Sequence, residues 1–368
     1  MSILRQNSAD TAGRDTLYGI IDPVPCVTKD APSQKANSDV VPESSVVSHR
    51  ATVRVPGSTS NVGSGFDCVG LAVDLWLVAT VSFDEIHPGL QSGIVAERES
   101  VSFVRNGTLK GLPVEAANDL VYIGFRSAYV FAGVESCGPV AFSVSSDIPV
   151  GRGLGSSAAA IVAGCMLANE ALSLGLTNAQ LLAVAAETEG HADNVAAALY
   201  GGAVLAVRTA IGYAIARLVV TPDIAFVIAV PGFACDTKAS RSALPEAVPY
   251  STAVSAISRS AALVKGLETG DPELLRAALD DVLHIPYRSA SIVGFDQVRA
   301  AALAAGAIGV TLSGSGSAIL AIGSVEVAAQ AGDAMVSAWK SVGIDATAII
   351  LREPAGAPTI IRQEERCP

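Results

Sequence analysis

A glycine-rich segment between an apolar strand and a helix constrains the fold of this chain more than any other feature. The segment PVGRGLGSSAAA spans residues 149–160; it follows a strand pattern at 140–145 and opens an Ala-rich helix predicted over 156–174. Its glycines carry no Cβ atoms, so several backbone N–H groups can converge on one anion, and the helix adds the positive end of its dipole. The order strand, glycine loop, helix therefore predicts a phosphate-binding site.

The glycine loop differs from two common nucleotide-binding motifs. It is not a Walker A loop, because no Gly-Lys-Ser/Thr follows the glycines and Arg152 is the only nearby cation in the sequence. Gly153, Gly155 and Ala158 also satisfy the G-x-G-x-x-A pattern of dinucleotide-binding dehydrogenases. That motif needs an early second strand, whereas helical patterns continue here to about residue 202. A tight strand-to-helix turn without a ligand is the plainer alternative.

Two further segments concentrate polar groups beside apolar runs. The first, PGSTSNVGSGFD at 56–67, holds Asn61, which can donate and accept hydrogen bonds, and Asp67, which can bind an ammonium group. The second, ETEGHADN at 187–194, places acids, a histidine and an amide next to the apolar run VAAALYGGAV, interpreted as a buried strand. A generic Gly/Ser turn and a capped surface loop are the respective alternatives. The density of ionisable groups in the second segment favours a site.

Charge and hydropathy exclude several classes of function. The 368 residues contain 35 Asp and Glu against 24 Lys and Arg, and this net charge of −11 argues against nucleic-acid binding. Only residues 300–325 suggest a membrane span, and the SGSGS at their centre predicts two short buried strands around a turn instead. The six cysteines form no CxxC pair and no signal-peptide pattern is present, so a cytoplasmic protein without a membrane partner is expected.

The periodicity of the chain predicts an α+β fold in two halves. Residues 1–50 are polar, proline-spotted and aperiodic, and are expected to form a disordered extension. From residue 51 strands and helices mix without a regular βαβ repeat, which disfavours a doubly wound sheet. A domain boundary is expected near residue 212 and a flexible tail over 356–368. Strands are predicted at 52–55, 70–83, 202–207, 213–220, 224–230, 310–312, 318–322 and 345–351. Helices are predicted at 118–132, 177–189, 250–282, 294–305 and 326–341, and Thr177 can cap the second of them.

Four segments resemble, in the same order, the motifs of the GHMP kinases, the superfamily named for galactokinase, homoserine kinase, mevalonate kinase and phosphomevalonate kinase. VRVPGSTSNVGSGFDCVGLAVDL is similar to the N-terminal motif, PVGRGLGSSAAA to the ATP-binding motif, EGHADNVAAALYGG to a Glu-Gly-His-Pro-Asp-Asn-Val segment, and GVTLSGSGSAILAI to the C-terminal glycine motif. Within the superfamily they look most like the homoserine kinase family. Gly57, Ala192 and Ser317 replace the usual Ala, Pro and Pro, which affects loop rigidity and removes no charged group.

The resemblance implies a two-domain GHMP kinase fold, with the ATP loop in an N-terminal domain at 51–211 and a ferredoxin-like C-terminal domain at 212–355. It implies ATP-dependent, Mg²⁺-requiring phosphorylation of the side-chain hydroxyl of L-homoserine in threonine biosynthesis, and it suggests a homodimer. One alternative is another GHMP kinase with a small hydroxylated substrate, such as mevalonate or threonine; mevalonate has no ammonium group for Asp67 to hold. The other is a catalytically dead GHMP fold with a regulatory role.

The resemblance also implies the residues of the site. The candidate ATP-binding residues are Asn118, Pro149, Gly151, Arg152, Gly153, Leu154, Gly155, Ser156, Ser157, Ala158 and Ala159. The candidate homoserine-binding residues are Asn61, Asp67, His191, Arg241 and Arg288. Arginine can capture a carboxylate through two hydrogen bonds, although each of these two arginines alone would read as a surface residue.

The implied magnesium ligands are Ser157 and Glu187, and the candidate catalytic residues are Asn194, Asp193 and Arg241. A carboxamide cannot accept a proton at neutral pH, so Asn194 is expected to orient the substrate hydroxyl while its proton leaves to phosphate or water.

Overall fold

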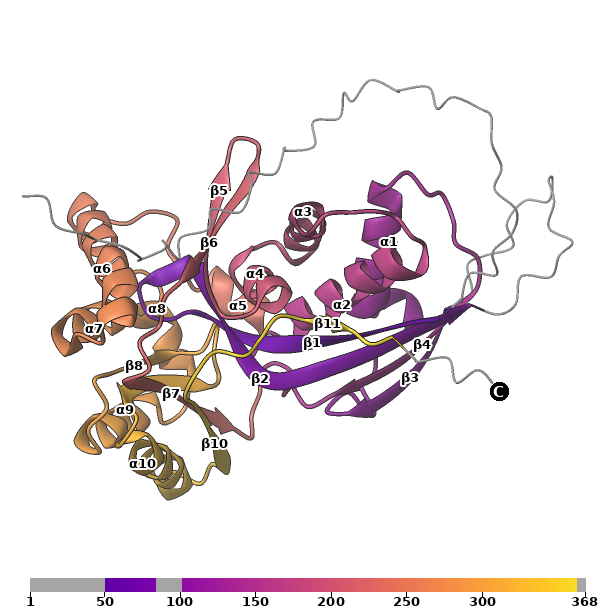
Figure 1. The fold of residues 1–368 in the computed structure, drawn as a ribbon. Helices are drawn as coiled ribbons and strands as arrows, with labels where there is room; N and C mark the ends of the chain where they lie inside the picture. Colours follow the sequence, from indigo (N-terminus) through magenta and orange to yellow (C-terminus); the bar gives the residue numbers. More distant parts are fainter. Residues whose placement is uncertain (1–49, 84–100, 363–368) are drawn as a thin grey trace, which may run out of the picture.

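The computed structural model describes residues 50–83 and 101–362, which form two α+β domains side by side (Figure 1). The predicted extension, except Arg50, lies outside the described residues. The glycine-rich turn predicted at residues 313–317 does separate two short buried strands, which are antiparallel neighbours. Among the described residues, no helix has the length and apolar character needed to cross a membrane.

The first domain is built on a seven-stranded sheet whose path runs β11-β1-β2-β4-β3, with the hairpin β5-β6 joined to β2. Its strands are β1 (Arg50–Asn61), β2 (Gly65–Phe83), β3 (Val101–Gly107), β4 (Val140–Ser146), β5 (Ala203–Thr209), β6 (Gly212–Leu218) and β11 (Thr359–Ile360). The β-branched run predicted as a strand forms most of β2, which is long enough to pair with β1, β4 and β5. Among the strands of the described residues, only β3 and β4 pair in parallel.

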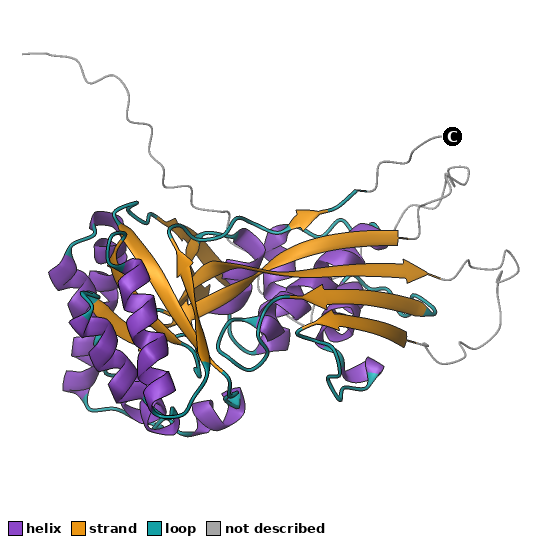
Figure 2. Ribbon diagram, turned by 90° about the horizontal axis from the view of Figure 1, so that it is seen from below, coloured by secondary structure: helices purple, strands orange, loops and turns teal. Residues whose placement is uncertain are grey.

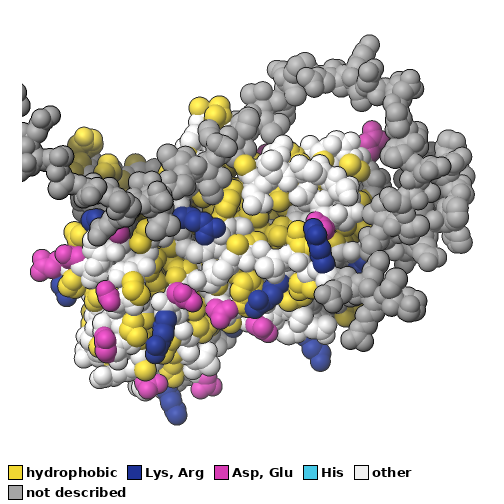
Figure 3. Space-filling view, in the orientation of Figure 1, with side chains coloured by type: hydrophobic (Ala, Val, Ile, Leu, Met, Phe, Trp, Pro, Cys, Tyr) yellow, Lys and Arg dark blue, Asp and Glu magenta, His cyan; other side chains and the backbone are white. Residues whose placement is uncertain are grey.

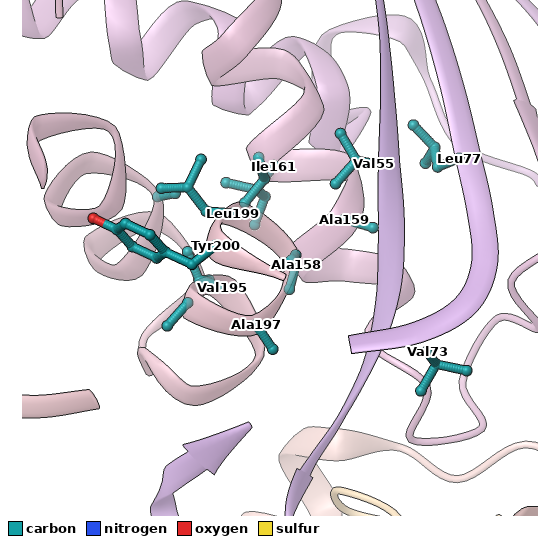
Figure 4. Packing of buried hydrophobic residues seen from close by; sticks show 14 of the residues in the cluster. Val55, Val73, Leu77, Ala158, Ala159, Ile161, Val195, Ala197, Leu199 and Tyr200 are labelled. Carbon is teal, nitrogen blue, oxygen red and sulfur yellow. The ribbon is translucent and has the colours of Figure 1, made fainter. Parts of the chain in front are cut away.

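Four helices of the first domain pack together on one side of this sheet (Figures 1 and 2). They are α1 (Leu120–Phe131), α2 (Ser156–Ala171), α3 (Asn178–Glu189) and α4 (Asp193–Tyr200). Helix α3 begins with the capping box of Thr177 and Gln180, so the predicted cap is confirmed. Small side chains let α2 lie close to β1: Ala158 and Ala159 are fully buried near Val55 (Figure 4).

The second domain has the ferredoxin-like order predicted for it. Strands β7 (Ile224–Pro231), β8 (Gly309–Leu312), β9 (Ile319–Ser324) and β10 (Ala346–Leu351) form an antiparallel sheet in the order β10-β7-β9-β8. With the intervening helices the chain follows a β-α-β-β-α-β path. The helices are α5 (Thr237–Ser242), α6 (Tyr250–Thr269), α7 (Pro272–Leu279), α8 (Ile285–Arg288), α9 (Phe295–Ala304) and α10 (Ala328–Ser341).

Strand β7 is buried on both faces, which explains its uninterrupted apolar sequence. Phe226 and Ile228 point to the main core, together with leucines of α6 and α7. Val227 and Ala229 point to a second core that contains Met335 and Trp339 of α10.

Four features differ from the sequence predictions. Strand β6 pairs with β5, so the first domain ends at about residue 218 rather than 211. Within the predicted flexible tail, β11 pairs with β1. Strand β3 was not predicted, because VSFVRNG lacks a clean apolar alternation. The run VAAALYGG begins as helix α4 rather than as a strand, since alanines stabilise a helix and the following glycines end it.

On the face of the molecule shown in Figure 3, acidic and basic side chains are interspersed.

The contact between α1 and α2 depends on a glycine. A Cβ atom at Gly164 would overlap the Val121 carbonyl oxygen. We therefore expect Gly164→Ala to lower the free energy of unfolding by roughly 1–3 kcal/mol, despite the higher helix propensity of alanine. Gly356→Ala is the control, because nothing lies within 4 Å of its added Cβ. Thermal unfolding measures both variants, and equal melting temperatures would contradict the close approach.

Candidate active site

A cavity of about 320 Å³ lies where the two domains meet. Its walls come from residues 60–67, which include the end of β1 and the start of β2 and are called here the β1–β2 loop, and from the glycine loop before α2, the start of α4, helices α5 and α8, and the β8–β9 turn. Segments as far apart in sequence as Ser60 and Ser315 line the same cavity. The three polar segments singled out from the sequence therefore meet at one place.

The backbone conformation of the glycine loop requires glycine at three positions. Gly151, Gly153 and Gly155 have φ of 68°, 71° and 68°, in the left-handed region that side chains disfavour. A Cβ at Gly153 would overlap the Ser313 carbonyl oxygen, and one at Gly155 would overlap Ser58. The loop is thus held between β1 and the β8–β9 turn, with the N-terminus of α2 facing the cavity.

Arg152 holds the loop in place through its guanidinium group. That group donates to the carbonyls of Val150 (2.6 Å), Pro231 (3.1 Å) and Gly232 (2.8 Å). These bonds tie the loop to the end of β7. The hydrogen bonds of the Arg152 side chain therefore go to backbone carbonyls, although the residue also lines the cavity.

The other candidate ATP-binding residues divide into two groups. Asn118, Leu154, Ser156 and Ser157 line the cavity with the three glycines, and Ala160 joins them. Pro149, Ala158 and Ala159 do not line it, and the two alanines are fully buried in the main core.

The acid beside Ser157 is Glu189 and not Glu187. Ser157 Oγ donates to Glu189 Oε1 at 2.5 Å, and both residues line the cavity. Glu187 is exposed and does not line it. The prediction of Glu187 is therefore corrected: two residues along a helix turn a side chain by about 200°, to the opposite face. Burial raises the pKa of Glu189, while Ser157 and the charge of His191 oppose this rise.

The start of α4 fixes His191 through Asp193. Asp193 Oδ1 accepts hydrogen bonds from the Asn194 backbone N–H (2.7 Å) and His191 Nδ1 (2.9 Å). Burial of the imidazole disfavours its charged form, but the hydrogen bond and charge of Asp193 prevail and raise the pKa of His191. Burial likewise opposes ionisation of Asp193, yet its bond to His191 leaves the pKa of Asp193 lowered.

Asn194 points its carboxamide at the β1 strand end. It accepts from Ser58 Oγ and donates to Ser60 Oγ, both at 2.9 Å. The two hydroxyls fix the rotation of the amide, which lines the cavity.

The β1–β2 loop has an unusual backbone. Asn61, Val62 and Asp67 have positive φ of 69°, 45° and 57°. The Asn61 side chain stabilises this shape, because it accepts from the Asp67 N–H (2.9 Å) and donates to the Gly314 carbonyl (3.0 Å). Both polar groups of Asn61 therefore brace the loop at the cavity wall.

Asp67 and Arg241 form a two-pronged ion pair across the domain interface, at 2.6 and 3.0 Å. Arg288 also lines the cavity and is only 3% exposed. Both guanidinium groups lie near the Phe66 ring, at 5.6 Å for Arg241 and 5.2 Å for Arg288. The polar end of the cavity thus carries two guanidinium groups and the carboxylate of Asp67, and the charge of Asp193 also acts on both arginines.

The apolar part of the cavity wall was missed by the sequence analysis. Leu109, Leu112 and Val114 line it beside Asn118. Arg105, which lies in the unpredicted strand β3, pairs with Asp119 at 2.8 Å. These three apolar residues lie between regular elements and follow neither a helix nor a strand period, so periodicity could not have identified them.

Known proteins share the sequence and the two-domain fold of this chain. Models for the GHMP kinase N-terminal and C-terminal domains match residues 119–202 and 263–341. A homoserine kinase of Nostoc sp. is 40% identical over 302 residues, which is 82% of this chain and 95% of that protein. A crystal structure of homoserine kinase from Cytophaga hutchinsonii has a TM-score of 0.73 and 31% identity, over 88% of this chain and 100% of that one. The L. major mevalonate kinase, solved with R-mevalonate, shares the fold, with a TM-score of 0.57 at 14% identity over 84% of this chain and 96% of that one.

The two family models fall on the two domains that enclose the cavity, so the protein is by class a GHMP kinase, an ATP-dependent phosphotransferase. Within that class, the 40% identity to the Nostoc sp. homoserine kinase over most of both sequences identifies the family. The chain belongs to the homoserine kinase family.

The glycine loop offers a matched pair of substitutions. Gly151→Ala and Gly153→Ala share the cost of a positive φ, but only the Cβ at 153 overlaps Ser313; the nearest atom at 151 is Ala234 Cβ at 3.1 Å. We expect Gly153→Ala to raise KM for ATP roughly tenfold more than Gly151→Ala, because the overlap displaces the loop. Steady-state kinetics at saturating second substrate measures this, and equal effects would show that the Ser313 contact does not shape the loop.

Proposed function

We propose that this protein transfers the γ-phosphoryl group of ATP to the side-chain hydroxyl of L-homoserine, which yields O-phospho-L-homoserine for threonine biosynthesis. The observation that carries the proposal is the polar end of the cavity. There Asp67, Arg241 and Arg288 offer partners for both charges of an amino acid, beside the amide of Asn194. An uncharged or purely anionic substrate would leave Asp67 without a role.

The nucleotide is assigned to the other end. The glycine loop and the N-terminus of α2 supply backbone N–H groups and a positive dipole for the phosphates. Leu109, Leu112 and Val114 offer an apolar surface for the adenine ring. The phosphates would then lie between the base and the amino acid, as in-line transfer requires.

The residues present fit a magnesium ion. Glu189 and Ser157 offer oxygen donors next to the glycine loop, and Mg²⁺ in nucleotide sites is commonly held by one or two protein ligands together with phosphates. The burial that raises the pKa of Glu189 disfavours an isolated carboxylate, so a nearby cation would stabilise its ionised form. Bound there, Mg²⁺ would neutralise charge on the β- and γ-phosphates.

The amino acid would bind by exchange of ion-pair partners. Asp67 and Arg241 neutralise each other in the free protein. A zwitterion can enter between them, giving its ammonium to Asp67 and its carboxylate to Arg241 and Arg288, so that each of these groups contacts an opposite charge. An arginine fork matches a carboxylate through two parallel hydrogen bonds, which fixes orientation as well as charge.

Positioning carries most of the proposed chemistry. Phosphoryl transfer has a loose transition state, so the protein needs mainly to align the hydroxyl with the γ-phosphorus and neutralise charge. Asn194, held by Ser58 and Ser60, would orient the hydroxyl as a hydrogen-bond partner that cannot take its proton. Asp193 would act through His191 and the Asn194 backbone, and the proton would leave to phosphate or water.

The direct test is a coupled assay of ADP release with homoserine, threonine, mevalonate and galactose as acceptors. We expect turnover on homoserine with kcat/KM well above that on the others. Comparable turnover on mevalonate would refute the role of Asp67, and turnover on none would favour a protein that has lost catalysis.

The choice between two glutamates tests the proposed metal site. Glu189→Gln removes a carboxylate from the cavity, so kcat should fall roughly a hundredfold and half-saturation by Mg²⁺ should shift to higher concentration. Glu187→Gln is the matched control, because this exposed side chain lies outside the cavity; it should change kcat by less than about twofold. The reverse result would restore Glu187 as the ligand.

Arg241→Lys tests the substrate end. Lysine keeps the charge but loses the planar fork, so KM for homoserine should rise roughly tenfold, as expected when one charge-assisted hydrogen bond is lost. KM for ATP should stay within about twofold. If ATP binding weakened while homoserine was unaffected, Arg241 would belong to the nucleotide end of the cavity.

A further inference from the structure

A fully buried histidine connects the two domains behind the substrate end of the cavity. His284 precedes α8 and is 0% exposed. Its Nε2 lies 3.0 Å from the Gly63 carbonyl oxygen in the β1–β2 loop, and its ring stacks on Phe66 with centroids 5.0 Å apart. The same loop carries Asn61 and Asp67, so one imidazole of the second domain contacts the substrate loop of the first.

The partners of His284 define its tautomer. A carbonyl oxygen only accepts hydrogen bonds, so Nε2 must carry the proton that is donated to Gly63. Nδ1 lies 3.5 Å from the Arg288 guanidinium Nη1, which only donates, so Nδ1 must be unprotonated. Burial, the largest influence, lowers the pKa of His284 and agrees with this neutral form.

Asp281 holds the backbone around the histidine. Its Oδ2 accepts from the N–H groups of Leu283 (3.0 Å), His284 (2.6 Å) and Ile285 (2.9 Å). The carboxylate therefore fixes the turn that projects His284 toward Gly63 and starts the short helix ending in Arg288.

Arg288 has few other restraints. Besides His284, its side chain donates only a long hydrogen bond to the Ser240 carbonyl, 3.4 Å from Nε, among the described residues. Unlike Arg241 it has no carboxylate partner at ion-pair distance within the described part of the chain. A buried guanidinium without a strong partner is costly, and a substrate carboxylate would relieve that cost.

We propose that His284 is a positioning residue, which links the Gly63 carbonyl to the Arg288 guanidinium and so sets the spacing between the carboxylate-binding arginine and the ammonium-binding loop. The inference rests on the proposed function, because it takes homoserine as the zwitterion whose two charges are spaced. His284 does not line the cavity, so it acts through Arg288 and through the loop.

Two substitutions separate the two links. In His284→Gln the amide nitrogen can replace Nε2 and keep the bond to Gly63, while the acceptor facing Arg288 is lost. In His284→Asn the shorter amide can keep an acceptor near Arg288 and loses its reach to Gly63. Thr311→Val is the control for disturbance of the core, because the Thr311 hydroxyl is also fully buried in the second domain and has no hydrogen-bond partner among the described residues.

The experiment compares homoserine with 3-aminopropan-1-ol, which is homoserine without its carboxylate. The full-length variants are assayed for KM, kcat and melting temperature; the amino alcohol is measured as a substrate or, if turnover is too slow, as a competitive inhibitor of homoserine. For His284→Gln we expect KM for homoserine to rise roughly tenfold with kcat and KM for ATP nearly unchanged, and binding of the amino alcohol to stay within about twofold. His284→Asn should weaken both ligands, and Thr311→Val neither.

A thermodynamic cycle gives a second readout that a purely structural role would not move. If His284 acts through Arg288, His284→Gln should raise KM for homoserine less than about twofold in an Arg288→Lys background. An unchanged KM in His284→Gln, equal losses for both ligands, or additive effects in the cycle would each overturn the proposal. Failure of the wild-type protein to phosphorylate homoserine would instead refute the proposed function on which the inference rests.

Discussion

The side chain of Ser313 joins the parts on which the site depends. Its hydroxyl donates to the Gly153 carbonyl (2.6 Å) and contacts Thr59 Oγ1 (2.8 Å), so a turn of the second domain touches both the glycine loop and β1. The neighbouring Gly314 adds two bonds, from its N–H to Ser60 and from Asn61 to its carbonyl. Because the cavity walls come from both domains, these buried bonds set the distance between nucleotide and acceptor ends.

Some charged groups of the cavity are balanced by an adjacent opposite charge and others are not. Asp193 pairs with His191, and Asp67 pairs with Arg241. Glu189, in contrast, contacts the Ser157 hydroxyl and lies 3.9 Å from the His191 imidazole. Arg288 has only weak neutral hydrogen-bond partners. The two groups without a strong partner lie where a cation and an anion are proposed to bind. Such imbalance is expected at functional sites, where a ligand completes the electrostatics.

Local signals in the sequence were enough for much of the fold. The Thr177 cap, the long strand β2 and the uninterrupted apolar run of β7 each depend on neighbouring residues, and each was predicted. Helix α4 was missed because its six apolar residues, VAAALY, fit a short strand as well as a helix. To choose Glu189 over Glu187, one must know which face of α3 points to the cavity. The link from His284 to Gly63 joins residues 221 positions apart, and no local pattern contains such a contact.

Strand β11 gives the molecule an unusual connectivity. The chain leaves the first domain after β6, builds the second domain through β10, and returns along β1, where Ile360 lies opposite Val53. The second domain is therefore an insertion with two covalent connections to the first. These two crossings act together with the buried core that strand β7 shares with the first domain. All three restrain the second domain against the first, and with it the position of Ser313 against the glycine loop.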